Sequence, residues 1–227
     1  MNLIKKKAGE GTTRDENLPA HTIVYEELKS QILFGDIVPG QAITIQGLTE
    51  SLGAGMTPVR EAIRRLISDG ALIFKGNRRV SVPELDDSAV EQIIFARISI
   101  ESEISRRAAV QIPKAEIDRL EEIDQQLDAA ITAGDVSSYL RLNHAFHESL
   151  YAAAEAPILA DLAGRLWLRF GPSMRVVCGR FGTQSLPDRH KEILTALRAR
   201  DVEAAAKATA DDIRQGMELM VGTLSGS

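Results

Sequence analysis

A chain of 227 residues, 44% of them hydrophobic, is long enough for one large or two modest domains with a buried core. Its apolar runs are far shorter than the roughly 18 residues of a membrane span, and no signal-type hydrophobic stretch follows Lys5, Lys6 and Lys7, so we expect a cytoplasmic protein. Cys178 is the only cysteine, which excludes an intrachain disulfide and a cysteine-based zinc site.

The charge is unevenly distributed along the chain. A net charge of −5 argues by itself against a nucleic-acid partner. Residues 1–83, however, hold 11 Lys and Arg against 9 Asp and Glu, whereas residues 84–227 hold 16 against 23. A surface that contacts nucleic acid is therefore expected in the N-terminal part.

The first part of the chain has the pattern of a small helical domain with a hairpin. Residues 1–20 are polar and aperiodic, which predicts a disordered arm. Three helices are then expected, at about residues 21–35, 46–52 and 58–69. Thr57 is predicted to cap the third of these helices, with Pro58 at its first position. Two runs with the period of strands follow, at residues 71–75 and 79–82. These elements predict a winged helix-turn-helix domain over residues 21–83.

The second part of the chain is predicted to be helical throughout. Residues 84–88 resemble a linker in which Asp86, Asp87 or Ser88 caps the next helix. Helices are expected at about residues 88–110, 114–133, 135–154, 157–178, 186–200 and 201–221. Without a strand signal, residues 89–222 should form an antiparallel all-helical bundle, so the fold class is mainly α.

The third helix carries the clearest nucleic-acid signal. Its apolar residues form one stripe, made up of Val59, Ala62, Ile63, Leu66 and Ile67. Arg60 and Arg64 therefore project together from another face, where Arg60 could bond to guanine in the major groove. The alternative is an ordinary solvated helix face, and the spacing alone does not decide between the two.

Other residues would add contacts to the DNA backbone. Thr57 and the first amides of the helix could hold a phosphate. Arg65, rotated about 100° from Arg64, is expected to serve a phosphate or a salt bridge with Glu61 or Asp69. Contacts from the wing are expected from Arg78 and Arg79.

Residues 22–83 closely resemble the DNA-binding domain of the GntR family of bacterial transcription regulators. The resemblance lies in YEELKSQILFGDIVPGQAI, LTESLGAGMTPVREAIRRLISDGALI and RRVSVP. Arg60 and Arg64 match the family pattern, whereas Met56 stands where members commonly have an Arg that touches DNA. The resemblance thus implies operator binding by these arginines, with an operator preference that need not follow that of the family.

Polar residues lie on the core-facing stripes of three helices in the second part. Asn143 and His147 share the stripe of one helix, whereas His144 is rotated about 100° away and is expected at the surface. His190 faces inward from a second helix, and Asp212 lies at the edge of the stripe of the last. Each could be a buried polar residue with one hydrogen-bond partner. Together they form a nitrogen and oxygen set suited to Zn²⁺, Ni²⁺ or Mn²⁺.

Residues 88–221 resemble the effector-binding FCD domain of the FadR-type subgroup of that family. The matching stretches are FARISIESEISRRAA, NHAFHESLYAAAEAPIL and HKEILTALRARDVEAAAKATADDI. Many members hold a metal with an Asp, a His four residues later, and two further His. By resemblance His147 and His190 match, Asn143 takes the place of the Asp, and Asp212 takes that of the last His. The set keeps one negative charge, so the resemblance implies a divalent metal site at Asn143, His147, His190 and Asp212.

Arg97 resembles an arginine that many such domains place on the first helix of the bundle. Beside a metal, it would favour a small carboxylate as effector, with one oxygen on the metal and one on the guanidinium. The alternative is an ion pair with Glu101, one turn along the helix.

The sequence therefore predicts a homodimeric transcription regulator that binds a pseudo-palindromic operator. Repression relieved by a small organic acid is the family's commoner mode. One alternative is a metal-free regulator with an apolar or acyl ligand. Another is a helical metal-dependent hydrolase that uses His147, His190 and Asp212. The adjacent His-Asp pair typical of helical phosphohydrolases does not occur in this chain, so we predict that it is not an enzyme.

Overall fold

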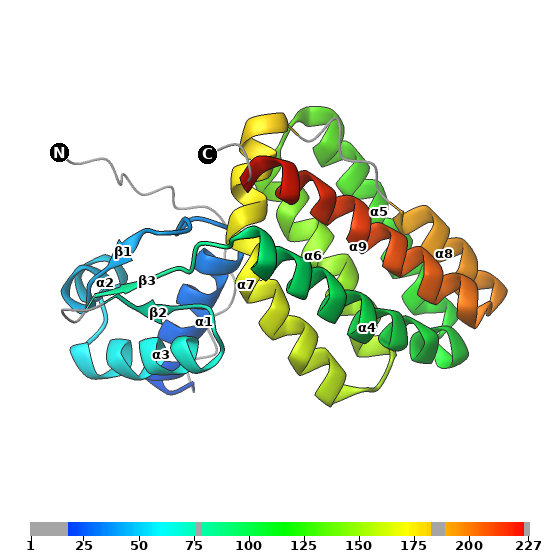
Figure 1. The fold of residues 1–227 in the computed structure, drawn as a ribbon. Coiled ribbons are helices and arrows are strands. Elements are labelled where there is room, and N and C mark those ends of the chain that lie inside the picture. Colours follow the sequence, from blue (N-terminus) through cyan, green and yellow to red (C-terminus); the bar gives the residue numbers. More distant parts are fainter. Residues whose placement is uncertain (1–17, 76–78, 183–188, 225–227) are drawn as a thin grey trace.

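The N-terminal part forms a three-helix unit with a small sheet. The computed structural model describes residues 18–75, 79–182 and 189–224 (Figure 1), so most of the predicted arm at residues 1–20 lies outside the described residues. The elements follow in the order α1 (Ala20–Leu33), β1 (Ala42–Ile43), α2 (Ile45–Leu52), α3 (Met56–Ser68), β2 (Ile73–Phe74) and β3 (Val80–Ser81). This is the predicted winged helix.

The sheet has one strand more than the sequence predicted. Its order is β1-β3-β2, and both pairings are antiparallel. Strands β2 and β3 form the expected hairpin, with Ile73 opposite Ser81, although its turn at residues 76–78 lies outside the described residues. Strand β1 pairs Ala42 with Ser81. Two residues are too short a run to show an alternating pattern, so β1 could not be predicted from the sequence.

The start of α3 corrects a prediction. The helix begins at Met56, and its N-cap is Gly55, whose extended backbone leads into the first turn. Thr57 therefore lies inside the helix and does not cap it. Pro58 is the third residue of the helix and not the first, two positions later than predicted, and is tolerated there because the amides of the whole first turn lack a partner within the helix.

After the linker, the described residues form helices joined by short connections. They are α4 (Asp87–Gln111), α5 (Lys114–Ala133), α6 (Val136–Ala153), α7 (Pro157–Phe181), α8 (His190–Ala199) and α9 (Val202–Leu224). Asp86 is the N-cap of α4, where its side chain accepts from the Ala89 amide at 2.8 Å. The fold class predicted from the sequence is confirmed, and no described helix has the length and apolar content to cross a membrane.

The helix boundaries on both sides of residues 183–188 differ from the prediction. Helix α7 continues through Gly179 to Phe181, although the glycine-rich stretch was expected to end it near residue 178. The buried apolar face ends at Val177 and Cys178, and the exposed residues Gly179 and Arg180 add one more turn, which closes where the Gly182 amide donates to the Cys178 carbonyl at 2.9 Å. Helix α8 begins at His190 and not at residue 186, and residues 183–188 lie outside the described residues.

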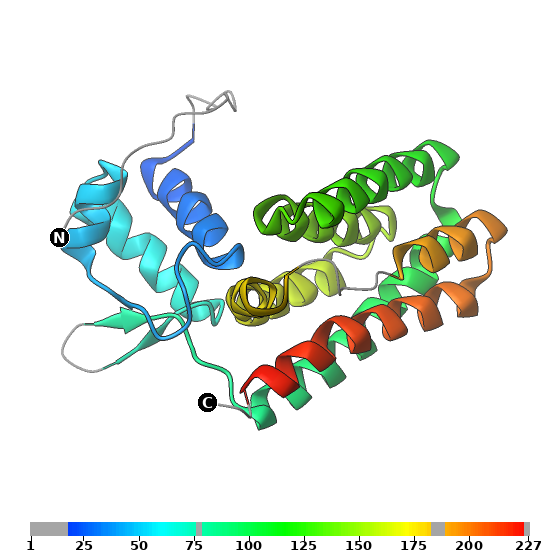
Figure 2. The same ribbon diagram turned by 90° about the horizontal axis from the view of Figure 1, so that it is seen from above.

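The bundle packs its helices in antiparallel pairs around an apolar core. Figure 2 shows α4 and α9 running side by side, and α5 packs against both α6 and α8. Helix α7 contacts α4 and α6 in the bundle and also α1 of the winged helix. This last contact is close, because a Cβ atom on Gly171 would lie 2.5 Å from the Leu33 carbonyl oxygen. The glycine therefore lets α7 reach the end of α1.

Candidate functional site

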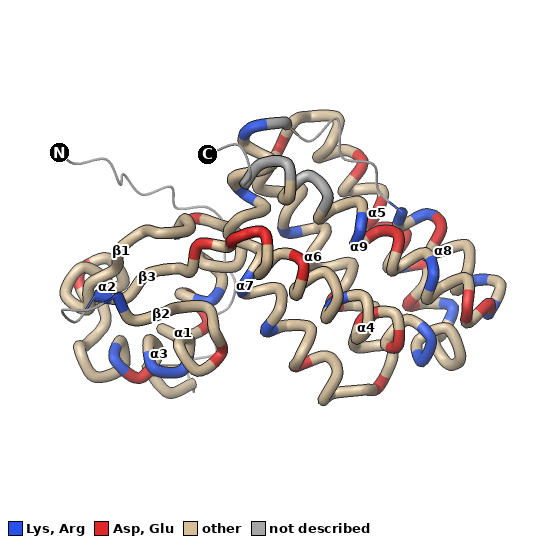
Figure 3. The backbone as a smooth tube through the Cα atoms, in the orientation of Figure 1, with Lys and Arg blue, Asp and Glu red and all other residues tan. Residues whose placement is uncertain are grey.

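The exposed face of α3 presents the predicted arginines to solvent. The apolar stripe faces inward, with Val59 and Leu66 fully buried and Ile67 half-buried. The side chains of Arg60, Arg64 and Arg65 are exposed. Figure 3 shows these basic positions along α3, whereas acidic residues gather at the linker and the start of α4. The surface of α3 thus has the charge that a DNA backbone attracts.

The three arginines have different neighbours. Arg64 donates to Glu61 at 2.8 Å in an exposed pair. Arg65 lies over the ring of Tyr25 in α1, 3.7 Å from its centroid. The Tyr25 hydroxyl donates to Asp69 at 2.9 Å, and burial together with this bond raises the pKa of Tyr25 to about 12. The partners expected for Arg65 thus bond to Arg64 and to Tyr25, while Arg65 helps hold α3 against α1.

The other predicted DNA contacts lie at the N-terminus of α3 and on the wing. Thr57 and Met56 are exposed in the first turn of α3. Arg79 is exposed just before β3, and its carbonyl accepts from the Lys75 amide at 2.9 Å across the hairpin. Arg78 lies outside the described residues.

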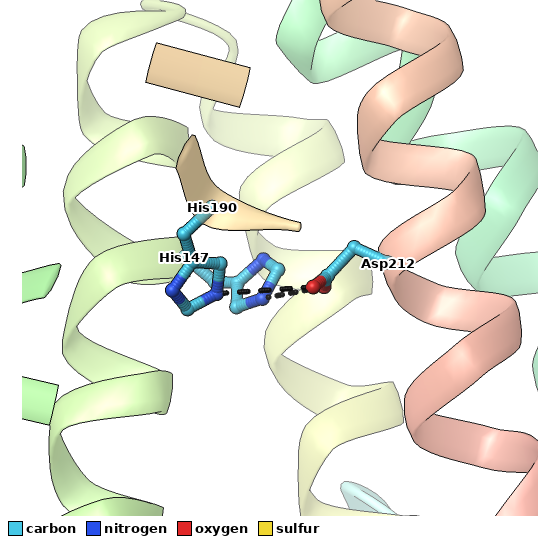
Figure 4. A group of neighbouring side chains, drawn as sticks. All are labelled: His147, His190 and Asp212. Carbon is cyan, nitrogen blue, oxygen red and sulfur yellow. Dashed lines mark ion pairs between the residues drawn. The ribbon is translucent and has the colours of Figure 1, made fainter. Parts of the chain in front are cut away.

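Three of the four predicted metal ligands converge inside the bundle. His147 from α6, His190 from α8 and Asp212 from α9 point toward one another (Figure 4). The Nε2 atom of His147 is 3.3 Å from Asp212 Oδ2, and the Nε2 atom of His190 is 3.9 Å from Asp212 Oδ1. Both histidines are only 1% exposed. Burial alone would raise the pKa of Asp212, but bonding to His147 and the charges of His190, His147 and Arg97 hold it well below its usual range.

Asn143 lines the same small cavity as two of these residues. The cavity measures about 30 Å³, and its walls include Arg97, Asn143, His147 and Asp212. That volume suits an ion or one water molecule, whereas pockets for small organic ligands are typically about 300 Å³ or more. A larger effector would have to widen the cavity.

The donor set fits a divalent metal ion. One ligand atom from each of His147, His190 and Asp212 lies within 4.8 Å of the others. In a tetrahedral site, ligand atoms about 2.0–2.2 Å from the ion lie about 3.3–3.6 Å apart, so the three side chains would have to move closer by up to about 1.5 Å to hold the ion. Nitrogen and carboxylate donors are those that Zn²⁺ accepts, and the half-buried Asn143 could add an amide oxygen.

Arg97 is held in a buried polar network. Its Nε and Nη2 atoms donate to the two oxygens of Glu101, at 2.6 and 3.1 Å. Glu101 also accepts from the Tyr151 hydroxyl at 2.5 Å, and Trp167 donates to that hydroxyl at 3.0 Å. The guanidinium lies over the rings of Phe170 and Trp167 as well. The ion pair with Glu101, expected as the alternative role of Arg97, is present, and Arg97 still lines the cavity.

His144 corrects the prediction that it lies at the surface. Its side chain is only 16% exposed, and its ring meets Phe34 edge-on at 5.7 Å and Trp167 at 4.9 Å. Burial lowers the pKa of His144 to about 4. The helical period of α6 could not reveal this, because Phe34 comes from the end of α1, which covers that side of the bundle.

Sequence analysis missed one carboxylate at the site. Asp124 in α5 is buried, and its Oδ1 atom is 3.3 Å from His190 Nδ1. A signal was available, because Asp124 shares a helical stripe with the buried Ile117, Leu120 and Leu127. A single Asp on such a stripe indicates a buried partner.

Comparisons with known proteins agree with this arrangement. Residues 92–215 match the model of the FCD domain, and residues 21–82 match that of bacterial regulatory proteins of the gntR family. Two of the similar proteins come from Escherichia coli K12. The HTH-type transcriptional regulator McbR is 27% identical over 92% of this chain and 96% of its own. The HTH-type transcriptional repressor RspR is 25% identical over 87% of both chains.

A solved structure shares the architecture over nearly the whole chain. The structure of E. coli McbR/YncC superposes with a TM-score of 0.85 at 26% identity and covers 91% of this chain and 99% of its own. The winged helix followed by the helical bundle is therefore the arrangement of a known regulator.

Proposed function

We propose that this chain, which belongs to the GntR family of bacterial regulatory proteins and is a DNA-binding transcriptional regulator with an FCD domain, is a repressor released by a small carboxylate. The effector would bind at a metal-containing pocket in the bundle. The observation that carries the proposal is the buried convergence of His147, His190 and Asp212 beside Arg97. The relatives are named as transcriptional regulators, so the chain is not an enzyme and the hydrolase alternative is set aside.

The metal would be held by His147, His190 and Asp212, with Asn143 as a fourth ligand. When bound, such an ion supplies a positive centre for an oxygen of the effector. The other contacts to the effector would come from side chains of the protein. Arg97 offers a second positive group on the same cavity wall, but its donors engage Glu101. An effector carboxylate would therefore compete with Glu101 for the guanidinium.

The size of the cavity favours this reading over a metal-free site for an acyl chain. About 30 Å³ suits an ion, whereas an apolar chain would require a much larger opening between α6, α7 and α9. The repressor assignment takes its support from RspR, a relative named as a repressor. The proposed direction is loss of DNA affinity on effector binding.

On the DNA side, we assign base contacts to Arg60 and Arg64 and phosphate contacts to Thr57, Arg65, Arg78 and Arg79. A homodimer would place two copies of α3 in successive major grooves, about 34–36 Å apart, on a pseudo-palindromic operator. The exposure of the α3 arginines supports this assignment.

Three measurements test the proposal. Metal analysis of protein purified without chelator should find close to one equivalent per chain, or reach it after addition of Zn²⁺ or Ni²⁺. Thermal-shift screening of small organic acids, with and without metal, should then identify acids that stabilise only the metal-loaded protein. Such an acid should weaken binding to an operator selected from genomic fragments by about 5- to 150-fold. A metal content well below one equivalent with no gain on addition would contradict the metal site.

A further inference from the structure

A buried carboxylate stands behind one of the proposed metal ligands without belonging to the ligand set. Asp124 is 3% exposed, and its Oδ1 atom lies 3.3 Å from Nδ1 of His190. Its other oxygen is 4.0 Å from the Lys191 ammonium, at the outer side of α8. One oxygen of Asp124 therefore faces the imidazole ring of His190 inside the bundle. The other faces the Lys191 ammonium on the outer side of α8.

The ring of His190 is held in place from two further directions. It stacks on Phe146, with 3.8 Å between ring centroids and an interplanar angle of 8°. Its Nε2 atom faces Asp212 at 3.9 Å. Phe146 thus sets the plane of the ring, while Asp124 and Asp212 lie at opposite nitrogens of the same ring.

The Oδ1 atom of Asp124 is available to accept a hydrogen bond. Among the described residues, Oδ1 is buried and has no hydrogen-bond partner. A buried carboxylate oxygen without a partner costs free energy and calls for an explanation. A hydrogen bond from the Nδ1 of His190, formed when an ion fixes the ring through Nε2, would supply that partner.

We propose that Asp124 is a positioning residue that accepts a hydrogen bond from Nδ1 of His190 and thereby presents Nε2 to a divalent metal ion beside Asp212. The proposal rests on the metal site of the proposed function. Histidine ligands generally donate their second ring nitrogen to a carboxylate or carbonyl, which fixes the ring and the position of its hydrogen.

The second histidine, His147, has a different carboxylate near its Nδ1 atom. Asp124 is therefore the better residue for a mutational test. The Nδ1 atom of His147 is 3.8 Å from Glu101. Glu101 already accepts from Arg97 and Tyr151, so its removal would disturb a separate buried network. Asp124 can be changed while that network stays intact.

The test compares metal affinity in the full-length wild type, Asp124→Asn and Asp124→Ala. Zn²⁺ affinity would be measured by competition with a chromogenic chelator, and the visible spectrum of Co²⁺-loaded protein would report the geometry of the site. Asp128→Asn is a matched control, because Asp128 is half-exposed on the same helix and pairs with Lys191 at 2.9 Å. It removes the same charge from the same helix, beside Lys191, without contacting the His190 ring.

We expect both Asp124 variants to bind Zn²⁺ about 10- to 100-fold more weakly than the wild type, with an altered Co²⁺ spectrum. Asp128→Asn should match the wild type in both measurements. Circular dichroism of the metal-free proteins verifies folding, and the isosteric Asn variant keeps the test valid if the Ala variant does not fold. Equal affinities in the wild type and Asp124→Asn, or an equal loss in Asp128→Asn, would overturn the role of Asp124 alone. A wild type that binds no metal would overturn the metal site itself and this inference with it.

Discussion

The arginines of α3 and the polar residues inside the bundle are both candidate binding groups, but they are held in opposite ways. Arg60 and Arg64 stand in water on one helix, and the fold does not depend on their charge. Arg97, Glu101 and His147 are nearly inaccessible and are fixed by one another. Exposed groups can be replaced without loss of folding free energy, whereas each buried group contributes to the stability of its domain. The two regions should therefore respond differently to the same kind of mutation.

The largest difference is expected at Glu101. Glu101→Ala would leave the Arg97 guanidinium buried and unpaired, and the removal of one partner of a buried pair costs about 3–5 kcal/mol. Chemical denaturation should show this loss in the free energy of unfolding. Glu103→Ala, two residues along α4 in a partly exposed pair with Arg107, should cost no more than about 1 kcal/mol. Similar losses in the two variants would remove the contrast between buried and exposed groups.

Metal addition should stabilise the bundle by a somewhat smaller amount. An ion that binds only the folded state at 100 times its Kd adds about 2.7 kcal/mol to the free energy of unfolding. The gain should appear as a higher Tm with Zn²⁺ or Ni²⁺ and disappear in His147→Ala and His190→Ala. If those variants gain as much as the wild type, the ion binds elsewhere.

At α3 the effect should fall on DNA and not on stability. Arg60→Ala should lose discrimination between the operator and unrelated DNA by about 5- to 150-fold, because a bidentate contact to guanine contributes about 1–3 kcal/mol. Its Tm should equal that of the wild type. Fluorescence anisotropy with both DNAs gives the comparison, and an unchanged operator preference would refute the base contact.

The smallest effect is expected on the wing. Arg79→Ala should weaken binding to all DNA sequences alike and lower the salt dependence of log K by about one unit, as loss of one phosphate contact does. We expect the same behaviour of Arg78→Ala. Titrations at several salt concentrations provide the measurement, and a change confined to the operator would assign the wing to base reading.

The sequence was sufficient where a feature depends on one element and insufficient where it depends on two. The apolar stripe of α3 and the inward direction of His147 and His190 follow from the period of single helices. The cap of α4 is one of the three residues named from the sequence, Asp86, Asp87 and Ser88, of which the structure shows Asp86. The burial of His144 does not, because Phe34 and Trp167 reach it from other helices.

Two further features could not be predicted from the sequence, because each depends on a contact with another element. Strand β1 exists only through its pairing with β3, so its two residues carry no pattern of their own. The partner of Asp124 could not be identified either, since His190 is brought to it by the packing of α8 on α5. Helical period shows that a residue is buried, while tertiary contacts decide which residue it meets.

The ring of His144 has a consequence for engineering hybrid regulators. It touches Phe34 at the end of α1 and Trp167 in α7, and Trp167 forms part of the wall of the cavity proposed for the effector. These three rings thus form one contact between the two halves of the molecule, beside the approach of Gly171 to Leu33. A chimera that joins the winged helix of one relative to the bundle of another at the linker would separate Phe34 from the other two. Such a hybrid should transplant Phe34 together with His144 and Trp167 if the bundle is to sense the position of its new DNA-binding domain.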